Sequence, residues 1–262
     1  MKKVAIITLA FNKLEEATKP YLKSLYQFTD TDMFDLILVN NGSTDETQKF
    51  IEDFASDKSN IIIIENSENL GYSKGNNIGI KEIIDKNYEY IGFLNNDILF
   101  TPNWLEDTLD AFNLDKSLGM LSPRNNAKSK LKMNNYLDNY KQFLSKFKAQ
   151  LKYVVTPSFS CVIVKKEVIE KIGGFDEAYS PAFWEDNDLS LRAMYAGYTL
   201  AYTNSAFIFH NHSTTSKDVL DDIKKRNQEY FFNKHPLGRW IWEHKRTNLL
   251  NDIKKYIIES FE

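Results

Sequence analysis

The sequence predicts an α/β fold in which helices cover both faces of a mostly parallel, doubly wound central sheet. Four short segments rich in Ile and Val are apolar without alternation, a pattern typical of parallel strands buried on both faces. Segments with helical character lie between them, and this strand–helix alternation over about 100 residues is typical of a doubly wound sheet.

Composition and charge fit a globular protein. The chain has 262 residues, of which 42% are hydrophobic and 26% charged, so it is long enough to bury a sizeable core. A net charge of −3 gives no reason to expect a nucleic-acid partner. The single cysteine, Cys161, has apolar neighbours and is predicted to be a buried thiol rather than a nucleophile.

No apolar stretch approaches the roughly 18 residues that a membrane-spanning helix needs. The basic start Met1-Lys2-Lys3 leads into an apolar segment too short for a typical signal peptide, so we interpret that segment as the first strand. These observations predict a soluble protein of a reducing, cytoplasmic compartment.

The first half of the chain contains the four apolar strands and three intervening helices. The predicted strands are Val4–Leu9, Leu36–Val39, Ile61–Ile64 and Tyr90–Leu94. The predicted helices are Leu14–Phe28, Thr44–Ala55 and Lys74–Lys86. Pro20 either kinks the first helix or marks its true start. Ser43 or Thr44 is suited to cap the second helix, and Asp45 and Glu46 suit its positive end.

The second half is less regular. Its predicted elements are a helix that starts at Pro102, a strand Phe159–Val164, a helix Lys165–Ile172 stopped by Gly173-Gly174, a helix Asn187–Ala196 and a strand Ala206–His210. Residues Lys128–Lys152 are either a mobile insertion or a surface helix that covers the site. We expect one catalytic domain over residues 1–215 and a helical C-terminal extension over residues 216–262.

A polar cluster follows each of the four first strands. In doubly wound sheets the ligand crevice lies at the carboxyl ends of the strands. Four clusters at one edge therefore predict a binding site rather than four unrelated turns. The clusters are Thr8–Lys13, Asn40–Thr47, Glu65–Gly79 and Asn95–Asp97.

The fourth cluster, Asn95-Asn96-Asp97, interrupts two apolar runs. A carboxylate beside an amide at a strand end suits a divalent metal ion that carries phosphate oxygens. The alternative is an ordinary polar turn, because these residues are common turn formers. The sequence of the triplet alone leaves both open.

Taken together, the motifs resemble the family-2 glycosyltransferases, which carry the GT-A fold. The matching motifs run in order through residues 4–216: Thr8-Leu9-Ala10-Phe11-Asn12, Asn40-Asn41-Gly42-Ser43-Thr44-Asp45, Asn69-Leu70-Gly71, Gly75-Asn76-Asn77-Ile78-Gly79, Leu94-Asn95-Asn96-Asp97, Gly173-Gly174-Phe175-Asp176, Glu185-Asp186-Asn187-Asp188-Leu189 with Arg192, Gly197-Tyr198 and His210. The resemblance implies an inverting enzyme that takes its sugar from a nucleotide diphosphate.

The resemblance also implies a donor site, with residues 1–100 as the nucleotide-binding half and residues 101–215 as the acceptor side. The implied donor-binding residues are Thr8, Ala10, Asn12, Glu15, Asn40, Lys74, Asn77, Asn96 and Asp97. Family members often have Asp where this chain has Asn40. An amide both donates and accepts, so a UDP-sugar is the expected donor and a dTDP-sugar stays open.

The triplet resembles the family's Asp-x-Asp signature with Asn in place of the first carboxylate. Asp97 is then the sole acidic ligand there for Mn²⁺ or Mg²⁺, beside the diphosphate oxygens. His210 resembles the family's late metal-binding histidine, and His212 is the alternative. We expect His235 and His244 to lie on the surface.

Asp186 matches the second position of the family's Glu-Asp pair and is the implied base for the acceptor hydroxyl, with Glu185 as runner-up. The alternative, that both residues cap the following helix, is compatible with catalysis. Trp184 either stacks on a sugar of the acceptor or is a buried aromatic residue. The transferred group is expected to be a hexosyl or N-acetylhexosaminyl unit.

Two other function classes compete with this interpretation. A sugar nucleotidyltransferase needs a glycine-rich loop after the first strand, and Thr8–Lys13 contains no glycine. A non-catalytic nucleotide-sugar or glycan-binding protein is disfavoured by the joint presence of Asp97, Asp186 and His210. The acceptor (a glycan, a lipid-linked oligosaccharide or a protein) and the oligomeric state stay open. The tail Pro236–Glu262 either packs on the domain, forms a dimer contact or lies on the inner face of the membrane.

Overall fold

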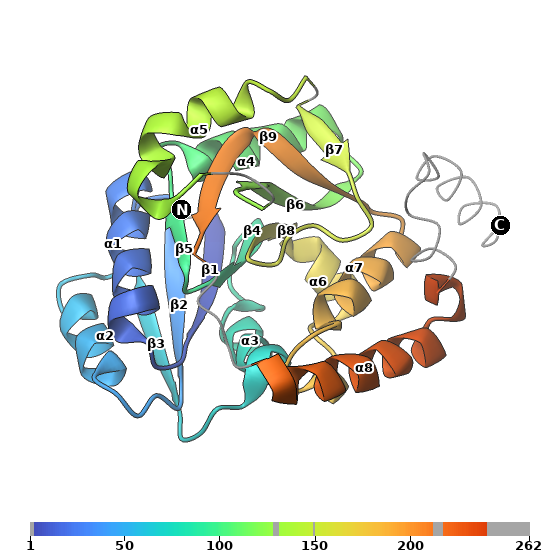
Figure 1. Cartoon of the computed structure of the whole chain (residues 1–262), viewed down its shortest axis with the longest axis horizontal. Helices are drawn as coiled ribbons and strands as arrows, with labels where there is room; N and C mark the ends of the chain where they lie inside the picture. Colours follow the sequence, from blue (N-terminus) through green and yellow to red (C-terminus); the bar gives the residue numbers. More distant parts are fainter. Residues whose placement is uncertain (1–2, 128–130, 149, 212–216, 240–262) are drawn as a thin grey trace.

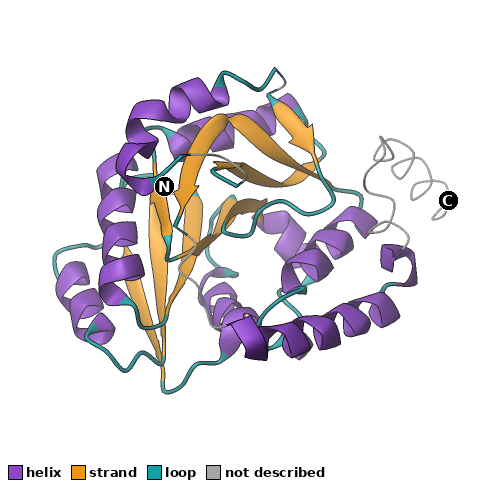
Figure 2. Cartoon of the chain, in the orientation of Figure 1, coloured by secondary structure: helices purple, strands orange, loops and turns teal. Residues whose placement is uncertain are grey.

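One sheet runs through the centre of the molecule, with helices on both of its faces (Figures 1 and 2). This computed structural model describes residues 3–127, 131–148, 150–211 and 217–239. Its strands are β1 Val4–Ala10, β2 Phe34–Asn41, β3 Ile61–Asn66, β4 Tyr90–Asn95, β5 Ile98–Phe100, β6 Leu118–Asn125, β7 Leu151–Tyr153, β8 Cys161–Lys165 and β9 Thr199–His210. Its α-helices are α1 Lys19–Phe28, α2 Thr47–Ala55, α3 Gly71–Ile83, α4 Trp104–Ala111, α5 Tyr136–Leu144, α6 Lys166–Ile172, α7 Glu185–Tyr195 and α8 Lys217–Lys234.

The sheet is parallel in its first half and mixed in its second. Its strand order is β3-β2-β1-β4-β8-β6-β9-β5, with β7 paired to β9. The predicted strands β1 to β4 are mutually parallel, as expected. The short strand β5 follows β4 after only Asn96 and Asp97, and a parallel connection needs a dozen or more residues. Strand β5 cannot lie parallel beside β4, and it pairs antiparallel with β9 at the end of the strand order.

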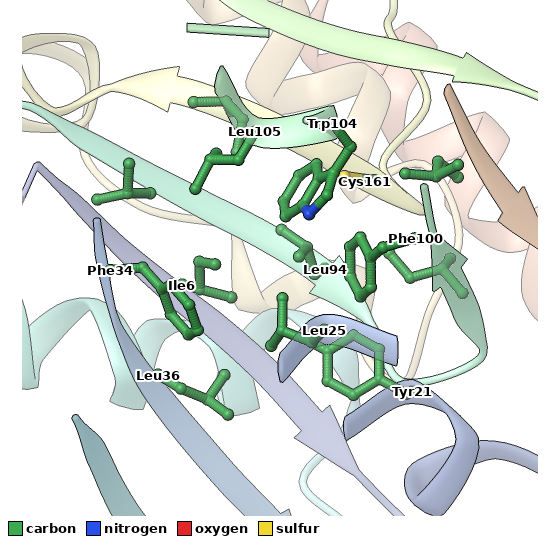
Figure 3. Packing of buried hydrophobic residues seen from close by; sticks show 14 of the residues in the cluster. Ile6, Tyr21, Leu25, Phe34, Leu36, Leu94, Phe100, Trp104, Leu105 and Cys161 are labelled. Atoms are coloured by element: carbon green, nitrogen blue, oxygen red, sulfur yellow. The ribbon is translucent and has the colours of Figure 1, made fainter. Parts of the chain in front are cut away.

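Both faces of the first strands are buried, which explains their continuous apolar runs. Val4 and Ile6 of β1 lie in a core cluster with residues of α1, α2 and α4 (Figure 3), whereas Ala5 and Ile7 lie in a second cluster with residues of α3, α6 and α7. Cys161 belongs to the first cluster, and burial raises the pKa of its thiol well above the usual range. The prediction of a buried, unreactive thiol is confirmed.

Several predicted boundaries were wrong. The first predicted helix divides before Lys19, and Pro20 marks the start of α1, which confirms one of the two expectations for this proline. A π-helical turn Leu14–Thr18 precedes α1, and the proline occupies the first turn of α1, where its missing N–H costs little. Helix α7 begins at Glu185, two residues before the predicted start. Strand β9 is more than twice as long as predicted, and β5, β6 and β7 were not predicted as strands.

Part of the predicted segment Lys128–Lys152 is helical. Residues Tyr136–Leu144 form helix α5, whose Tyr136 and Tyr140 are buried against β9, whereas residues 128–130 and 149 lie outside the described residues. That this helix covers the site stays a prediction. Among the described residues no helix is both long and apolar enough to cross a membrane. Of the predicted C-terminal extension, α8 lies along α7 (Figure 1), whereas residues 240–262, including His244, are outside the described residues, as is His212.

Candidate active site

The polar clusters after the first strands do meet at one edge of the sheet. The parallel register places Ala10 of β1 beside Asn40 of β2, and Asn41 beside Asn66 of β3. On the other side of β1, Leu9 pairs with Asn95 of β4. The carboxyl ends of four strands are thus aligned, so the predicted convergence of their clusters is confirmed.

The loops after β1 and β2 are joined by Asn12. This residue adopts a left-handed backbone conformation, with φ of 51°. Its N–H donates to Ser43 Oγ at 3.0 Å and its Oδ1 accepts from the N–H of Thr44 at 2.8 Å. Ser43 and Thr44 therefore bind Asn12 rather than capping α2, and the Asp45 carboxylate accepts the helix N–H of Thr47 instead.

Asp97 and His210 form a pair at the same edge. His210 Nε2 lies 3.1 Å from Asp97 Oδ1, and the two side chains are only 15% and 11% exposed. The pairing follows from the sheet, because antiparallel β5 and β9 place Ile98 opposite His210, directly next to Asp97. Two residues 113 positions apart in the sequence (210 minus 97) thus become direct neighbours.

This pair fits a divalent metal ion. Carboxylate oxygen suits both Mn²⁺ and Mg²⁺, and imidazole nitrogen is a common ligand of transition metals. Within the described residues there is no group of three or more His, Cys, Asp or Glu side chains that would enclose an ion without help. A metal bound here would need further oxygen ligands, such as those of a diphosphate.

Other predicted donor-binding residues have structural partners. Thr8 is fully buried, and its Oγ1 lies 2.6 Å from the hydroxyl of Tyr21 in α1. Asn77 exchanges hydrogen bonds with the backbone of Phe175, at 2.8 Å in both directions. Asn77 is half-buried and also donates to Glu177 Oε1 at 3.0 Å. A donor role for either residue stays a prediction.

The remaining predicted residues lie nearer the edge. Asn96 Nδ2 donates to Thr18 Oγ1 at 2.9 Å, and Asn40 Oδ1 accepts from the N–H of Ser43 at 3.2 Å. Glu15 is exposed and paired with Lys19, a contact worth little in water. Lys74 is exposed in the first turn of α3, and Ala10 ends β1.

Glu185 and Asp186 form the first turn of α7. The positive end of the helix favours their charges. Asp186 Oδ1 accepts hydrogen bonds from both the backbone and the side-chain N–H of Asn187, each at 2.8 Å. The preceding residues Phe183 and Trp184 both have left-handed φ values, 76° and 75°, which cost about 1–2 kcal/mol each in residues other than glycine. Backbone strain of this kind concentrates at functional sites.

Glu185 is buried at a cost. It is 7% exposed, and its Oε2 has no hydrogen-bond partner among the described residues. Burial, followed by the negative charge of Asp186, raises the pKa of Glu185 to about 8. The Glu185 carboxyl therefore keeps its proton to higher pH than an exposed glutamate does.

Two chain segments, residues 125–126 and residues 156–158, connect the two ends of the candidate site through hydrogen bonds. Asn126 exchanges hydrogen bonds with the backbone of His210 at 2.6 and 3.1 Å, and its neighbour Asn125 donates to Ser158 Oγ at 3.1 Å. Two residues before Ser158, Thr156 Oγ1 donates to Asn187 Oδ1 at 3.1 Å. These two segments thus link the Asp97–His210 pair to the first turn of α7.

Trp184 is a buried aromatic residue, 6% exposed, with its ring 5.1 Å from that of Phe231 in α8. Of the two alternatives, burial is the one observed. His235 was predicted to lie on the surface, and this was wrong: it is 6% exposed and its Nε2 lies 2.8 Å from Asp188 Oδ1.

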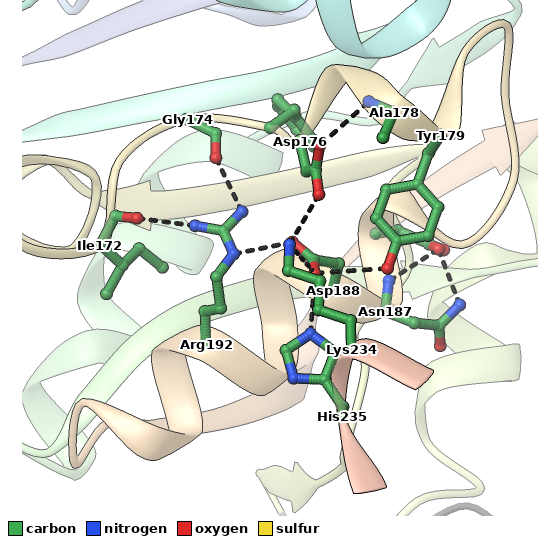
Figure 4. A network of polar contacts seen from close by, with 12 residues as sticks. Ile172, Gly174, Asp176, Ala178, Tyr179, Asn187, Asp188, Arg192, Lys234 and His235 are labelled. Carbon is green, nitrogen blue, oxygen red and sulfur yellow. Dashed lines mark hydrogen bonds and ion pairs between the residues drawn. The ribbon is translucent and has the colours of Figure 1, made fainter. Parts of the chain in front are cut away.

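Asp188 is the centre of a buried charge network (Figure 4). Its carboxylate lies 2.7 Å from both Arg192 Nε and Lys234 Nζ. Burial alone would raise the pKa of Asp188, but the hydrogen bond to His235 and the charges of Arg192 and Lys234 outweigh it and hold the pKa well below the usual range. The sequence analysis placed Asp188 and Arg192 in a family motif but did not predict this network; their four-residue spacing on a helix was the local signal for an ion pair.

Comparison with known proteins places these features in a family. The family model described as Glycosyl transferase family 2 matches residues 5–173. The O-antigen chain rhamnosyltransferase WbaN of Salmonella anatum is 31% identical over 219 residues, which cover 79% of this chain and 64% of that protein. A teichoic acid poly(glycerol phosphate) polymerase of Staphylococcus epidermidis is 32% identical over 124 residues, 47% of this chain and 16% of that protein. The chain thus spans less than two thirds of these relatives.

Solved structures share the fold. A mannosyltransferase from Pyrobaculum calidifontis, in complex with GDP-Man and Mn²⁺, superposes with a TM-score of 0.66 at 16% identity, covering 88% of this chain and 63% of that one. GalNAc-T7 with UDP, GalNAc and Mn²⁺ gives 0.65 at 13% identity, covering 98% and 56%. The predicted GT-A fold is confirmed.

Replacing Glu185 tests whether its burial is costly. A carboxyl with a raised pKa contributes stability below its unfolded value of 4.5, and this is lost as pH rises through about 8. Glu185→Gln should therefore gain stability relative to the parent protein between these limits, by up to a few kcal/mol at the alkaline end. Urea unfolding across this pH range measures the difference, with exposed Glu229→Gln as the control. A difference that does not vary with pH would contradict the buried, protonated state.

Asp188→Asn tests the charge network, in which the pKa of the buried carboxylate is lowered rather than raised. The ionised Asp188 contributes stability above its unfolded pKa of 3.8, which is lost as pH falls further. The variant should lose about 3–5 kcal/mol at neutral pH, because Arg192 and Lys234 would be left beside an uncharged group. The deficit should shrink below about pH 4. Exposed Asp222→Asn is the matched control, and a deficit under about 1 kcal/mol would mean that the network is not stabilising.

Proposed function

The chain belongs to glycosyl transferase family 2, and from that premise we propose that it is an inverting glycosyltransferase. It moves a sugar from a nucleotide diphosphate donor, most suitably a UDP-sugar, to an acceptor hydroxyl. The observation that carries the proposal is the 3.1 Å pairing of Asp97 with His210 at the carboxyl edge of the sheet. That edge is where α/β sheets bind their ligands.

Asp97 and His210 would hold a divalent ion, Mn²⁺ or Mg²⁺, on the donor diphosphate. Bound there, the ion would act as a Lewis acid that neutralises the charge developing on the leaving diphosphate. Two protein ligands leave most of the coordination sphere to diphosphate oxygens and water, as is common for these ions. We therefore expect the metal to bind weakly alone and tightly with the nucleotide.

Asp186 would take the proton of the acceptor hydroxyl. Glu185 is the less suitable base of the pair, because burial raises its pKa to about 8 and favours its neutral form. Both N–H groups of Asn187 hold the Asp186 carboxylate from one side, which fixes its orientation. One base and one displacement invert the anomeric configuration.

The nucleoside end of the donor would lie against the loops after β1 and β2. Ala10, Asn12 and Asn40 are at the ends of these strands, and Asn12 holds the two loops together. Asn40 offers an amide, which does not discriminate strongly between uracil and thymine. Residues 1–100 would thus form the nucleotide half and residues 101–215 the acceptor side.

The relatives bear on the sugar and the acceptor. One is named for rhamnosyl transfer to O-antigen chains and another for teichoic acid, which supports a growing surface glycan or glycolipid as the acceptor. Rhamnose is a deoxyhexose, so we extend the expected hexosyl or N-acetylhexosaminyl group to deoxyhexosyl units. The cytoplasmic location stays a prediction.

A panel of nucleotide sugars, scored for nucleotide release with and without Mn²⁺, tests the proposed function. We expect release from at least one donor, dependent on the metal. Asp97→Ala should abolish the metal-dependent part of donor binding in a calorimetric titration, because it removes the one carboxylate ligand. Exposed Asp222→Ala is the control. Donor binding by Asp97→Ala that still responds to Mn²⁺ as in the parent would refute this role.

Asp186→Asn separates binding from chemistry. The amide keeps the size of the side chain but cannot take a proton. Donor affinity should be nearly unchanged, while turnover should fall by two to four orders of magnitude, roughly the contribution of general base catalysis. Steady-state kinetics over a range of donor concentrations measure both. Turnover close to that of the parent would place the base elsewhere, with Glu185→Gln as the next variant to assay.

A further inference from the structure

The loop that leads into α7 is held through its backbone along its whole length. Each carbonyl from residue 179 to residue 183 accepts a hydrogen bond from another element of the protein. Asn227 Nδ2 donates to the carbonyls of Tyr179, Ala182 and Phe183, at 2.6, 2.8 and 3.0 Å. An unsatisfied buried carbonyl costs about 1–3 kcal/mol, so removing this side chain would destabilise the loop.

The two remaining carbonyls are bound from both sides of the loop. Arg226 Nη2, from α8, donates to the carbonyl of Ser180, and the backbone N–H of Tyr72, from α3, donates to that of Pro181 at 2.8 Å. Arg226 also donates to Asn227 Oδ1, at 3.0 and 2.8 Å, which orients the amide so that its N–H groups face the loop.

Asn227 is buried, at 1% exposure, where α8 meets the loop that leads into α7. Around it, Phe231 packs against Trp184, and Lys234 and His235 bind Asp188 (Figure 4). The end of helix α8 is therefore fixed to the start of α7 at several points. It also lies entirely beyond residue 173, where the match to the family model ends.

We call the hydrogen bonds from Asn227 to the 179–184 loop the clamp. The clamp matters because the backbone of this loop is strained. Phe183 and Trp184 adopt left-handed conformations that residues with a side chain avoid, and they immediately precede Glu185 and Asp186. Without the hydrogen bonds from Asn227, these two residues would relax toward ordinary φ values. The first turn of α7 would then turn with them and carry the Asp186 carboxylate away from its place.

We propose that Asn227 is a positioning residue, which holds the 179–184 loop so that Asp186 points at the reacting hydroxyl. This inference rests on the proposed function of Asp186 as the base. Asn227 has no contact with the Asp97–His210 pair or with the loops after β1 and β2 in the described part of the chain. Its loss should therefore affect chemistry and leave donor binding intact.

The test uses Asn227→Leu, which keeps the branched shape of the side chain and removes its donors. The matched control is Asn233→Leu, because Asn233 is exposed on the same helix. Turnover per folded molecule should fall about 10- to 100-fold, the effect of displacing a catalytic group by about 1 Å. The affinity for UDP with Mn²⁺ should change less than about twofold, and the control should match the parent in both.

Arg226→Ala provides a second variant in case Asn227→Leu does not fold. Its side chain is exposed, so it opens no hole, and it should lower turnover to a smaller extent while UDP affinity is kept. Turnover within about twofold of the parent in every folded variant, or a parallel loss of UDP affinity and turnover, would overturn the inference.

Hydrogen exchange tests the clamp independently of activity. The amides of Ser180 and of residues 182–187 should exchange faster in Asn227→Leu than in the parent, and Asn233→Leu should leave them protected. If the parent releases nucleotide from no donor, the proposed function fails, while the exchange data still judge the clamp. Unchanged protection in Asn227→Leu would overturn the clamp even in an active enzyme.

Discussion

The antiparallel pairing of β5 with β9 is the contact on which the candidate site depends. It places Ile98 opposite His210, and the backbone N–H of Asn211 donates to the carbonyl of Asp97 at 2.9 Å. Asp97 itself follows β4 after a single residue, so the same pairing brings a carboxylate at the end of the parallel half against an imidazole at the end of the last strand. The core on both faces of the sheet keeps these strand ends in place.

The second requirement is to hold two carboxylates in the first turn of α7. The dipole of the helix favours negative charge in this turn, and the raised pKa of Glu185 favours its neutral form, which lessens the repulsion between the two carboxyl groups. The strained backbone at Phe183 and Trp184 is balanced by hydrogen bonds from α3 and α8. Strain and buried charge, each unfavourable alone, are thus concentrated in one loop and stabilised by elements that converge on it.

The sequence predicted what depends on local pattern and missed what depends on distant partners. Continuous apolar runs identified β1 to β4, and the polar residues after them identified the edge that carries the site. Strand β6 was not predicted because it contains Gly119 and Pro123, which are unusual in strands. His235 was misplaced because its burial comes from Asp188, 47 positions earlier, and no local pattern reports such a contact. No local pattern reported that Thr8 would bind Tyr21 or that Asn77 would bind the backbone of Phe175.

The position of the metal tests the central claim most directly. Crystals of the protein grown with UDP and Mn²⁺ would locate the ion by its anomalous scattering. We predict one strong peak within about 2.0–2.3 Å of both an Asp97 carboxylate oxygen and a His210 ring nitrogen, with diphosphate oxygens completing the coordination. An ion bound to the diphosphate without Asp97, or held at a different edge of the sheet, would contradict this assignment.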